Sequence, residues 1–165
     1  MGAIHETALA MRDAAPSGVL MGLDLGSKTI GIAVSDVERR LAAPLTTLRR
    51  AARLTPDLER LLALAEARAA RGFVLGLPRN MDGSEGARCD STRSFARNLA
   101  RRTALPILLW DERLTTAAAE DGLNAAGLPK KRRANVIDQV AAAHILEAAL
   151  AGMAALDQTM GSEGG

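Results

Sequence analysis

The sequence contains a single cysteine, Cys89, and no second thiol with which that residue could form an intramolecular disulfide. A disulfide-built fold and a thiolate metal site are both excluded, and a lone cysteine is typical of a reducing compartment such as the cytoplasm. No apolar run approaches the roughly 20 residues of a membrane-spanning helix, and Glu6, Arg12 and Asp13 interrupt the stretch where a signal peptide would lie. We therefore expect a cytoplasmic protein without a membrane segment.

Aromatic residues are almost as scarce, with one tryptophan, two phenylalanines and no tyrosine. This scarcity disfavours the kind of RNA-binding sheet that stacks bases on several aromatic rings. An excess of charge of one sign is also lacking, because 21 basic and 19 acidic residues leave a net charge of +2. A balance of this size is compatible with a polyanionic partner but does not predict one.

The chain does have the composition of an ordinary globular domain, since its 165 residues are 48% hydrophobic and 24% charged. We expect one folded unit over residues 18–151. Residues 1–17 mix alanine with scattered charges and are expected to form a flexible N-terminal extension. Residues 152–165 end in Gly-Ser-Glu-Gly-Gly and are expected to form a flexible C-terminal tail.

Short apolar runs and longer periodic segments alternate within this unit. Strands are predicted over five apolar runs, 19–25, 30–34, 44–48, 73–77 and 106–110. Helices are predicted over four segments with leucine and alanine periodicity or capping residues, 56–71, 87–102, 115–126 and 135–151. The first three strands form an antiparallel meander, because only short turns separate them.

This order of elements predicts an α/β fold in which helices flank a five-stranded mixed sheet, made of the antiparallel meander plus parallel strands. The first, fourth and fifth strands are expected to run parallel, so their carboxyl ends share one edge of the sheet. Ligands of open α/β sheets bind at such an edge. Asp24, the loop after Leu77 and the pair Asp111-Glu112 all fall there, so we expect the functional site at this edge.

Asp24 lies within an otherwise apolar strand, where an unpaired carboxylate is costly to bury. A metal ion would satisfy it, and the alternative is a set of hydrogen bonds from the Gly26-Ser27-Lys28 turn. Asp111 and Glu112 are adjacent, so their side chains point to opposite faces and only one is expected to serve the site. The alternative for this pair is a charged approach to the next helix.

Asp138 falls in the first turn of the last predicted helix, where it either reaches the sheet edge or favours the positive end of the helix. A carboxylate cluster without an opposing base selects hard cations such as Mg²⁺ or Mn²⁺. Two such ions about 4 Å apart activate a water for in-line attack on a phosphodiester and stabilise the departing oxygen. The expected catalytic and metal-binding residues are Asp24, Asp111, Glu112 and Asp138.

Basic side chains are expected to surround this acidic pocket and to hold the phosphates of a substrate. The expected substrate-binding residues are Lys28, Arg79, Arg113, Lys130, Lys131, Arg132 and Arg133. The alternative for the basic run at 130–133 is a solvated loop. His5 and His144 have no metal-ligand spacing, and His144 is expected to be structural.

Four segments together resemble the YqgF family: GLDLGSKTIGIAVSD at 22–36, GLPRNMDGSEG at 76–86, DERLTT at 111–116 and DQVAAAHIL at 138–146. They occur in the family's order, and the likeness extends from about Val19 to Leu150. Members of this family are described as pre-16S rRNA nucleases or Holliday junction resolvases with an RNase H-like fold. The four motifs are highly specific jointly, whereas any one alone is a weak signal.

The resemblance implies an RNase H-like fold and a metal-dependent endonuclease that processes the 5′ end of pre-16S rRNA during ribosome biogenesis. It implies that Asp24 is the first-strand metal ligand, that the Asp111-Glu112 pair supplies the next acid and that Asp138 supplies the third. Thr29 stands where the family usually has an arginine, which leaves Lys28 as the only cation of that turn. The implied partners are structured RNA or branched DNA and a ribosomal precursor particle. The oligomeric state is left as a monomer or homodimer.

Three other functions remain open at this stage. The first is a Holliday junction resolvase acting on branched DNA, and the second is a non-catalytic RNA-binding factor with the same fold. The third is a nucleotide-binding switch, because the turn from Asp24 to Lys28 also looks like the phosphate loop of actin-like ATPases and sugar kinases. Those proteins enclose the nucleotide between two lobes, and a chain of 165 residues holds only one.

Overall fold

The computed structural model describes the backbone of residues 1–114 and 130–163, and the side chains of residues 1–114 and 137–157. Six strands form one mixed sheet in the order β1-β6-β5-β2-β3-β4. The strands are β1 (Ile4–His5), β2 (Leu20–Leu25), β3 (Thr29–Ser35), β4 (Ala42–Arg49), β5 (Gly72–Leu77) and β6 (Ile107–Asp111). β1, β6, β5 and β2 run parallel, while β3 and β4 continue the sheet antiparallel. The predicted α/β class and the parallel group of β2, β5 and β6 are confirmed.

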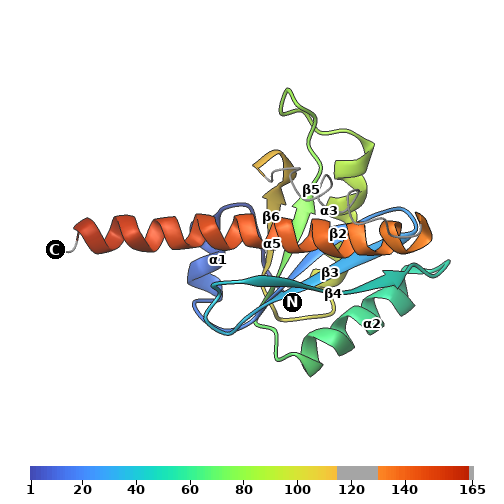
Figure 1. The fold of residues 1–165 in the computed structure, drawn as a ribbon, viewed down its shortest axis with the longest axis horizontal. Coiled ribbons are helices and arrows are strands. Elements are labelled where there is room, and N and C mark those ends of the chain that lie inside the picture. The colour runs from blue at the N-terminus through green and yellow to red at the C-terminus, as the bar shows by residue number, and fades with distance from the viewer. Residues whose placement is uncertain (115–129, 164–165) are drawn as a thin grey trace.

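Helices cover both faces of this sheet. The described helices are α1 (Ala8–Ala14), α2 (Leu54–Ala67), α3 (Ala87–Ala100), the short 3-10 turn η1 (Glu112–Leu114) and α5 (Lys130–Glu163). Successive residues of a strand point to opposite faces, so Leu23 and Leu75 pack with α2 and α3 while Leu20 and Val74 pack with α1 and α5. Figure 1 shows α5 as the long helix that crosses the strands and extends past the sheet toward the C-terminus.

Two glycines allow α5 to lie directly against the strands. A Cβ built on Gly22 would lie 2.7 Å from Leu146 Cβ, and one built on Gly31 would overlap the backbone carbonyl of Asp138. Neither position has room for a side chain. The backbone of α5 at Asp138 therefore rests on the backbone of β3, which fixes where this part of the helix sits over the sheet.

Elements at both ends of the chain differ from those predicted from the sequence. Five strands were expected, but Ile4–His5 adds a sixth by pairing with Ile107 and Leu108 of β6, inside the segment expected to be a flexible extension. A two-residue strand is too short to show periodicity. Met11 of α1, in the same expected extension, is fully buried in the core with Leu20 and Val74. The last helix runs over Lys130–Glu163, longer than the 135–151 expected, and continues into the expected C-terminal tail.

Packing explains this longer helix. Gly152 lies against the indole of Trp110, and Met153 is buried. Arg12 of α1 forms an ion pair with Asp157 of α5, with an N–O distance of 2.8 Å. The helix expected over 115–126 lies outside the described residues.

One stretch of the described residues, Ile137–Asp157 of α5, is long and apolar enough to cross a membrane by length and composition. Within it, Ala142, Leu146 and Ala149 are fully buried. The same residues pack with Val74 and Leu108 of the sheet. Packing against the sheet therefore accounts for the apolar residues on the buried side of this helix.

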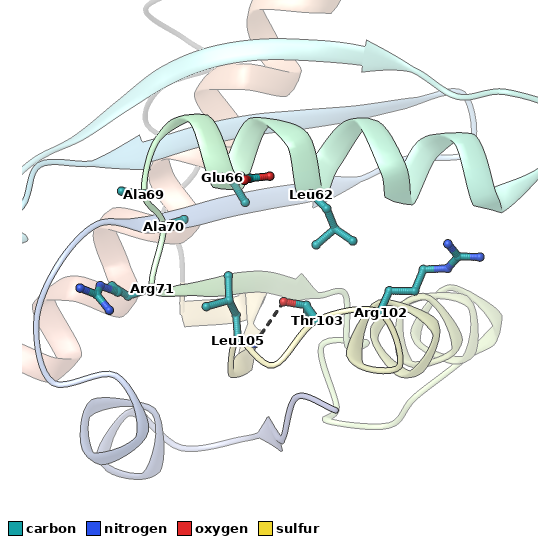
Figure 2. A pocket seen from close by; sticks show the side chains of 9 residues that line it. Leu62, Glu66, Ala69, Ala70, Arg71, Arg102, Thr103 and Leu105 are labelled. Carbon is teal, nitrogen blue, oxygen red and sulfur yellow. Dashed lines mark hydrogen bonds between the residues drawn. The ribbon is translucent and has the colours of Figure 1, made fainter.

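A pocket of about 520 Å³ opens at the amino-terminal ends of β5 and β6. Figure 2 shows its lining, in which Leu62 and Glu66 of α2 face Thr103 and Leu105 of the loop before β6. This pocket lies at the opposite end of the parallel strands from Asp24 and Glu112, because those residues follow the carboxyl ends of β2 and β6. It is therefore separate from the acids that the sequence singles out.

Candidate active site

Asp24 lies one residue before the end of β2, on the face of the sheet that α5 covers, because its neighbours Leu23 and Leu25 pack on the other face. The side chain is half-buried, and no described residue donates a hydrogen bond to its carboxylate. Burial is the largest cause that raises the pKa of Asp24, and together with the negative charges of Glu112 and Asp138 it brings this pKa to about 7. The turn that follows does not satisfy this carboxylate, since Gly26 N donates instead to Thr29 O at 2.9 Å.

Glu112 is the first residue of η1, directly after β6. Its carboxylate lies over Gly76 of β5, where a Cβ would be 2.5 Å from Oε1 and 2.7 Å from Ile145 of α5. Glu112 is therefore on the same face as Asp24. Burial raises its pKa above the ordinary value.

Asp138 approaches from α5, and Thr29 at the start of β3 holds its side chain. Thr29 Oγ1 donates a hydrogen bond of 2.7 Å to Asp138 Oδ2. Three carboxylates from β2, η1 and α5 thus lie near the carboxyl ends of the parallel strands, and two of them act electrostatically on the third. Residues 24, 112 and 138 are far apart in the sequence, and the fold brings them into one electrostatic neighbourhood.

Asp111 points to the opposite face from Glu112, as the alternation along a strand requires. Its Oδ2 accepts a hydrogen bond of 2.7 Å from Arg113 Nη2, and its Oδ1 accepts one of 3.0 Å from the Arg113 backbone. The hydrogen bonds from the Arg113 side chain are the largest cause that lowers the pKa of Asp111. Asp111 and Arg113, both expected in the site, are therefore engaged with each other.

The remaining basic residues differ in their surroundings. Lys28 is exposed in the β2–β3 turn. Arg79 is held between Glu6 and Glu85, with N–O distances of 3.7 and 3.5 Å. Arg93 of α3 joins the same two acids at 2.7 Å each, so a four-membered charge cluster ties the start of the chain to the β5–α3 loop. The side chains of Lys130, Lys131, Arg132 and Arg133 lie outside the described ones.

Two residues near the acids were not found from the sequence. Thr29 was noted only as a departure from the family pattern, and its bond to Asp138 spans 109 residues. Arg88, in the first turn of α3, carries a positive charge that lowers the pKa of both Asp24 and Glu112. Neither belongs to a periodicity or spacing that could reveal the contact.

The acids have the right chemistry for a hard divalent cation, because carboxylate oxygens are the ligands that Mg²⁺ and Mn²⁺ prefer. The excess negative charge that raises the pKa of Asp24 is what a cation would neutralise. Among the described residues, no three His, Cys, Asp or Glu side chains are gathered closely enough to enclose one ion. The residues that could hold a metal are therefore Asp24, Glu112 and Asp138. Their carboxylates lie near one another but do not surround a single ion position.

A mixed sheet with helices on both faces and acids at the ends of its parallel strands defines the RNase H-like class of fold. The structure of Thermus thermophilus RuvC shares this fold, with a TM-score of 0.52 and 14% sequence identity over 84% of this chain and 96% of that one. Residues 18–152 match the family described as "RuvX: Holliday junction resolvase", and the chain belongs to that family. The family places the chain among the nucleases, which hydrolyse phosphodiester bonds.

Curated relatives are similar over most of their length. A protein of Rhodopseudomonas palustris (strain BisB5) is 58% identical over 141 residues, 86% of this chain and 88% of the relative. One of Paracoccus denitrificans (strain Pd 1222) is 57% identical over 148 residues, 89% of this chain and 93% of the relative. Both carry the name "Putative pre-16S rRNA nuclease". The resemblance drawn from the four sequence motifs is therefore confirmed at the level of the family.

Proposed function

We propose that the protein is a divalent-metal-dependent endonuclease that processes the 5′ end of pre-16S rRNA in the cytoplasm. The observation that carries this proposal is the position of Asp24, Glu112 and Asp138, whose charges meet at the carboxyl edge of the sheet. The RNA substrate is supported by the names of relatives that are 57 and 58% identical. The protein would bind this RNA as part of a ribosomal precursor particle.

In the proposed mechanism, the chain supplies the ligands and the electrostatic setting. Asp24, Glu112 and Asp138 would hold one or two Mg²⁺ or Mn²⁺ ions, while Thr29 fixes the rotamer of Asp138 by its hydrogen bond of 2.7 Å. When bound, such ions activate water and stabilise the charge that develops on the phosphate. Asp111 would act indirectly and would not bind the metal itself, because its ion pair with Arg113 orients the segment that carries Glu112.

The direct test is cleavage by the Asp24→Asn variant. Purified wild-type protein is incubated with Mg²⁺ or Mn²⁺ and an RNA that spans the 5′ precursor junction of 16S rRNA, and products are mapped at nucleotide resolution. Asp24→Asn should abolish cleavage while the circular dichroism spectrum stays unchanged. Glu59→Gln is the matched control, because Glu59 is an exposed acid of α2. Undiminished cleavage by Asp24→Asn contradicts the proposal.

A second candidate substrate is a four-way DNA junction, favoured by the description of the family that the chain matches. The same acids would serve it, because both reactions hydrolyse a phosphodiester. The two are separated by offering both substrates to the same preparation. Paired symmetric nicks in the junction with untouched RNA would favour the resolvase, whereas RNA binding without cleavage of either substrate would favour a non-catalytic factor.

A further inference from the structure

A second cavity lies beside the acids, on the α2 and α3 side of the same sheet edge. Its volume is about 850 Å³. The β2–β3 turn forms one wall with Gly26 and Ser27, and α3 forms another with Arg88 and Ser91. The third wall is the segment that follows β4 and includes Arg50. The cavity is thus built on the turn that directly follows Asp24.

Arg50 shapes this cavity and is already satisfied. Its Nη1 donates a hydrogen bond of 2.8 Å to the carbonyl of Gly26, and its Nε lies 3.5 Å from Asp57 Oδ2. The guanidinium also lies 5.9 Å from the centre of the Phe95 ring. Arg50 therefore anchors the turn against the wall of the cavity, and it shares the buried carboxylate of Asp57 with Arg60, whose Nη2 lies 2.8 Å from Asp57 Oδ1.

Arg88 is exposed, and no hydrogen bond or ion pair joins its guanidinium to any residue that the structure describes. Other arginines near this edge are engaged: Arg79 and Arg93 with Glu6 and Glu85, and Arg113 with Asp111. The hydroxyls of Ser27 and Ser91 also have no partner among the described residues. One unpaired guanidinium and two hydroxyls are groups that commonly bind nucleic-acid phosphates.

The position of Arg88 connects the cavity to the acids. Its side chain lines the cavity, and its charge lowers the pKa of both Asp24 and Glu112. An anion bound by Arg88 would therefore lie next to the carboxylates rather than among them. For a strand whose scissile phosphate is at the acids, that anion is a phosphate further along the same backbone.

We propose that this cavity holds the sugar-phosphate backbone of the substrate strand, with Arg88 binding a phosphate that neighbours the scissile one. The proposal rests on the nuclease function proposed above and adds the side from which the strand reaches the acids. The strand would pass over Ser27 and Ser91 before it reaches Asp24. Arg88 would act on substrate affinity.

The test compares Arg88→Gln with Arg97→Gln, a change of the same charge at an exposed position of the same helix outside the cavity. Binding is measured by fluorescence anisotropy with labelled precursor RNA and with a labelled four-way DNA junction. The Asp24→Asn background prevents cleavage and keeps position 24 neutral. Arg88→Gln should raise Kd by about tenfold, the effect of one charge-assisted contact. It should also lower the slope of log Kd against log salt by about 0.7 to 0.9.

Steady-state cleavage provides a second reading in the otherwise wild-type chain. Arg88→Gln should raise KM, whereas Arg97→Gln should change neither KM nor kcat. Equal behaviour of the two variants in binding and in KM overturns the proposal. So does a shift in the pH profile of kcat with no change in KM or salt slope, because Arg88 would then act only through the acids.

The binding assay also separates this inference from the proposed function. If wild-type protein cleaves neither substrate but Arg88→Gln still weakens binding and flattens the salt dependence, the nuclease proposal fails and the strand contact stands. If wild-type protein cleaves and Arg88→Gln binds as tightly as Arg97→Gln, the nuclease proposal stands and the strand contact fails. If wild-type protein cleaves neither substrate and the Asp24→Asn protein that retains Arg88 binds neither, both proposals are overturned.

Discussion

Thr29 Oγ1 donates a hydrogen bond of 2.7 Å to Asp138 Oδ2, and this bond joins the first residue of β3 to a helix that begins more than a hundred residues later. The resemblance to the YqgF family implies an arginine at this position. In this chain the residue there is a short hydroxyl side chain that contacts an acid of the candidate site. Thr29 is therefore a positioning residue for Asp138.

Replacing Thr29 by valine should weaken the site without disturbing the strand, because valine keeps the β-branched shape and removes the donor. We expect about tenfold weaker Mg²⁺ activation and a loss of about 1–2 kcal/mol in the free energy of unfolding. Mg²⁺ titration of cleavage and urea unfolding measure the two effects. Thr29→Ser keeps the hydroxyl and should restore most of the Mg²⁺ response; equal defects in the two variants would count against a positioning role.

The raised pKa of Asp24 predicts how stability depends on pH. The folded state binds this proton up to about pH 7, whereas an unfolded aspartate loses it near the ordinary value of 3.8. Between these values the folded state holds more protons, so metal-free wild-type protein loses stability as pH rises, by a few kcal/mol in total. The Asn of Asp24→Asn carries no such penalty.

Asp24→Asn should therefore melt close to wild type near pH 4 and roughly 5–10 °C above it at pH 8, when EDTA is present. Thermal melts across this range give the difference directly. Mg²⁺ at pH 8 should narrow the gap, because it binds the charged wild-type site more tightly. A gap that is constant with pH would show that Asp24 is not held in a protonated state.

Glu112 and Asp111 should behave differently when each is neutralised. Glu112→Gln removes an acid that faces Asp24 and should abolish metal-dependent cleavage. Asp111→Asn removes the partner of Arg113 and should leave metal affinity within a few-fold of wild type. Calorimetric Mn²⁺ binding together with cleavage assays distinguishes them. If Asp111→Asn loses Mn²⁺ binding and Glu112→Gln retains it, the assignment of the two faces is reversed.

Gly31→Ala should displace α5, because the added methyl group would overlap the carbonyl of Asp138. Overpacking of this kind costs about 1–3 kcal/mol. We expect that loss in urea unfolding, together with a marked fall in cleavage as Asp138 moves. Gly86→Ala is the control, since a Cβ there meets only Asn80 at 3.8 Å and should cost less than about 1 kcal/mol. Similar losses for both variants would argue against a specific contact at Gly31.

The sheet could be predicted because alternation and turn residues are local signals. The strands around Asp24 and Asp111 follow from their apolar runs, and the shared edge follows from parallel pairing. Strand alternation also predicts that Asp111 and Glu112 face opposite sides. It could not tell which of them faces Asp24, because that depends on which side of the sheet α5 covers.

The features that were missed depend on contacts distant in sequence. The bond from Thr29 to Asp138 and the field of Arg88 at Asp24 have no local signature. The strand at Ile4–His5 is too short for a pattern, and only its pairing with β6 creates it. A Coulomb interaction or a two-residue strand exists only once the tertiary fold has formed.

The charge cluster of Glu6, Arg79, Glu85 and Arg93 makes the first residues of the chain part of the site's support. Shortened versions that start after residue 6 would lose both the edge strand β1 and Glu6, whose Oε1 lies 2.7 Å from Arg93 Nη2. The β5–α3 loop would then keep only Glu85 to hold its arginine, and Arg113 contacts that loop at Met81. For recombinant work, trimming the N-terminus is therefore a change to the enzyme itself.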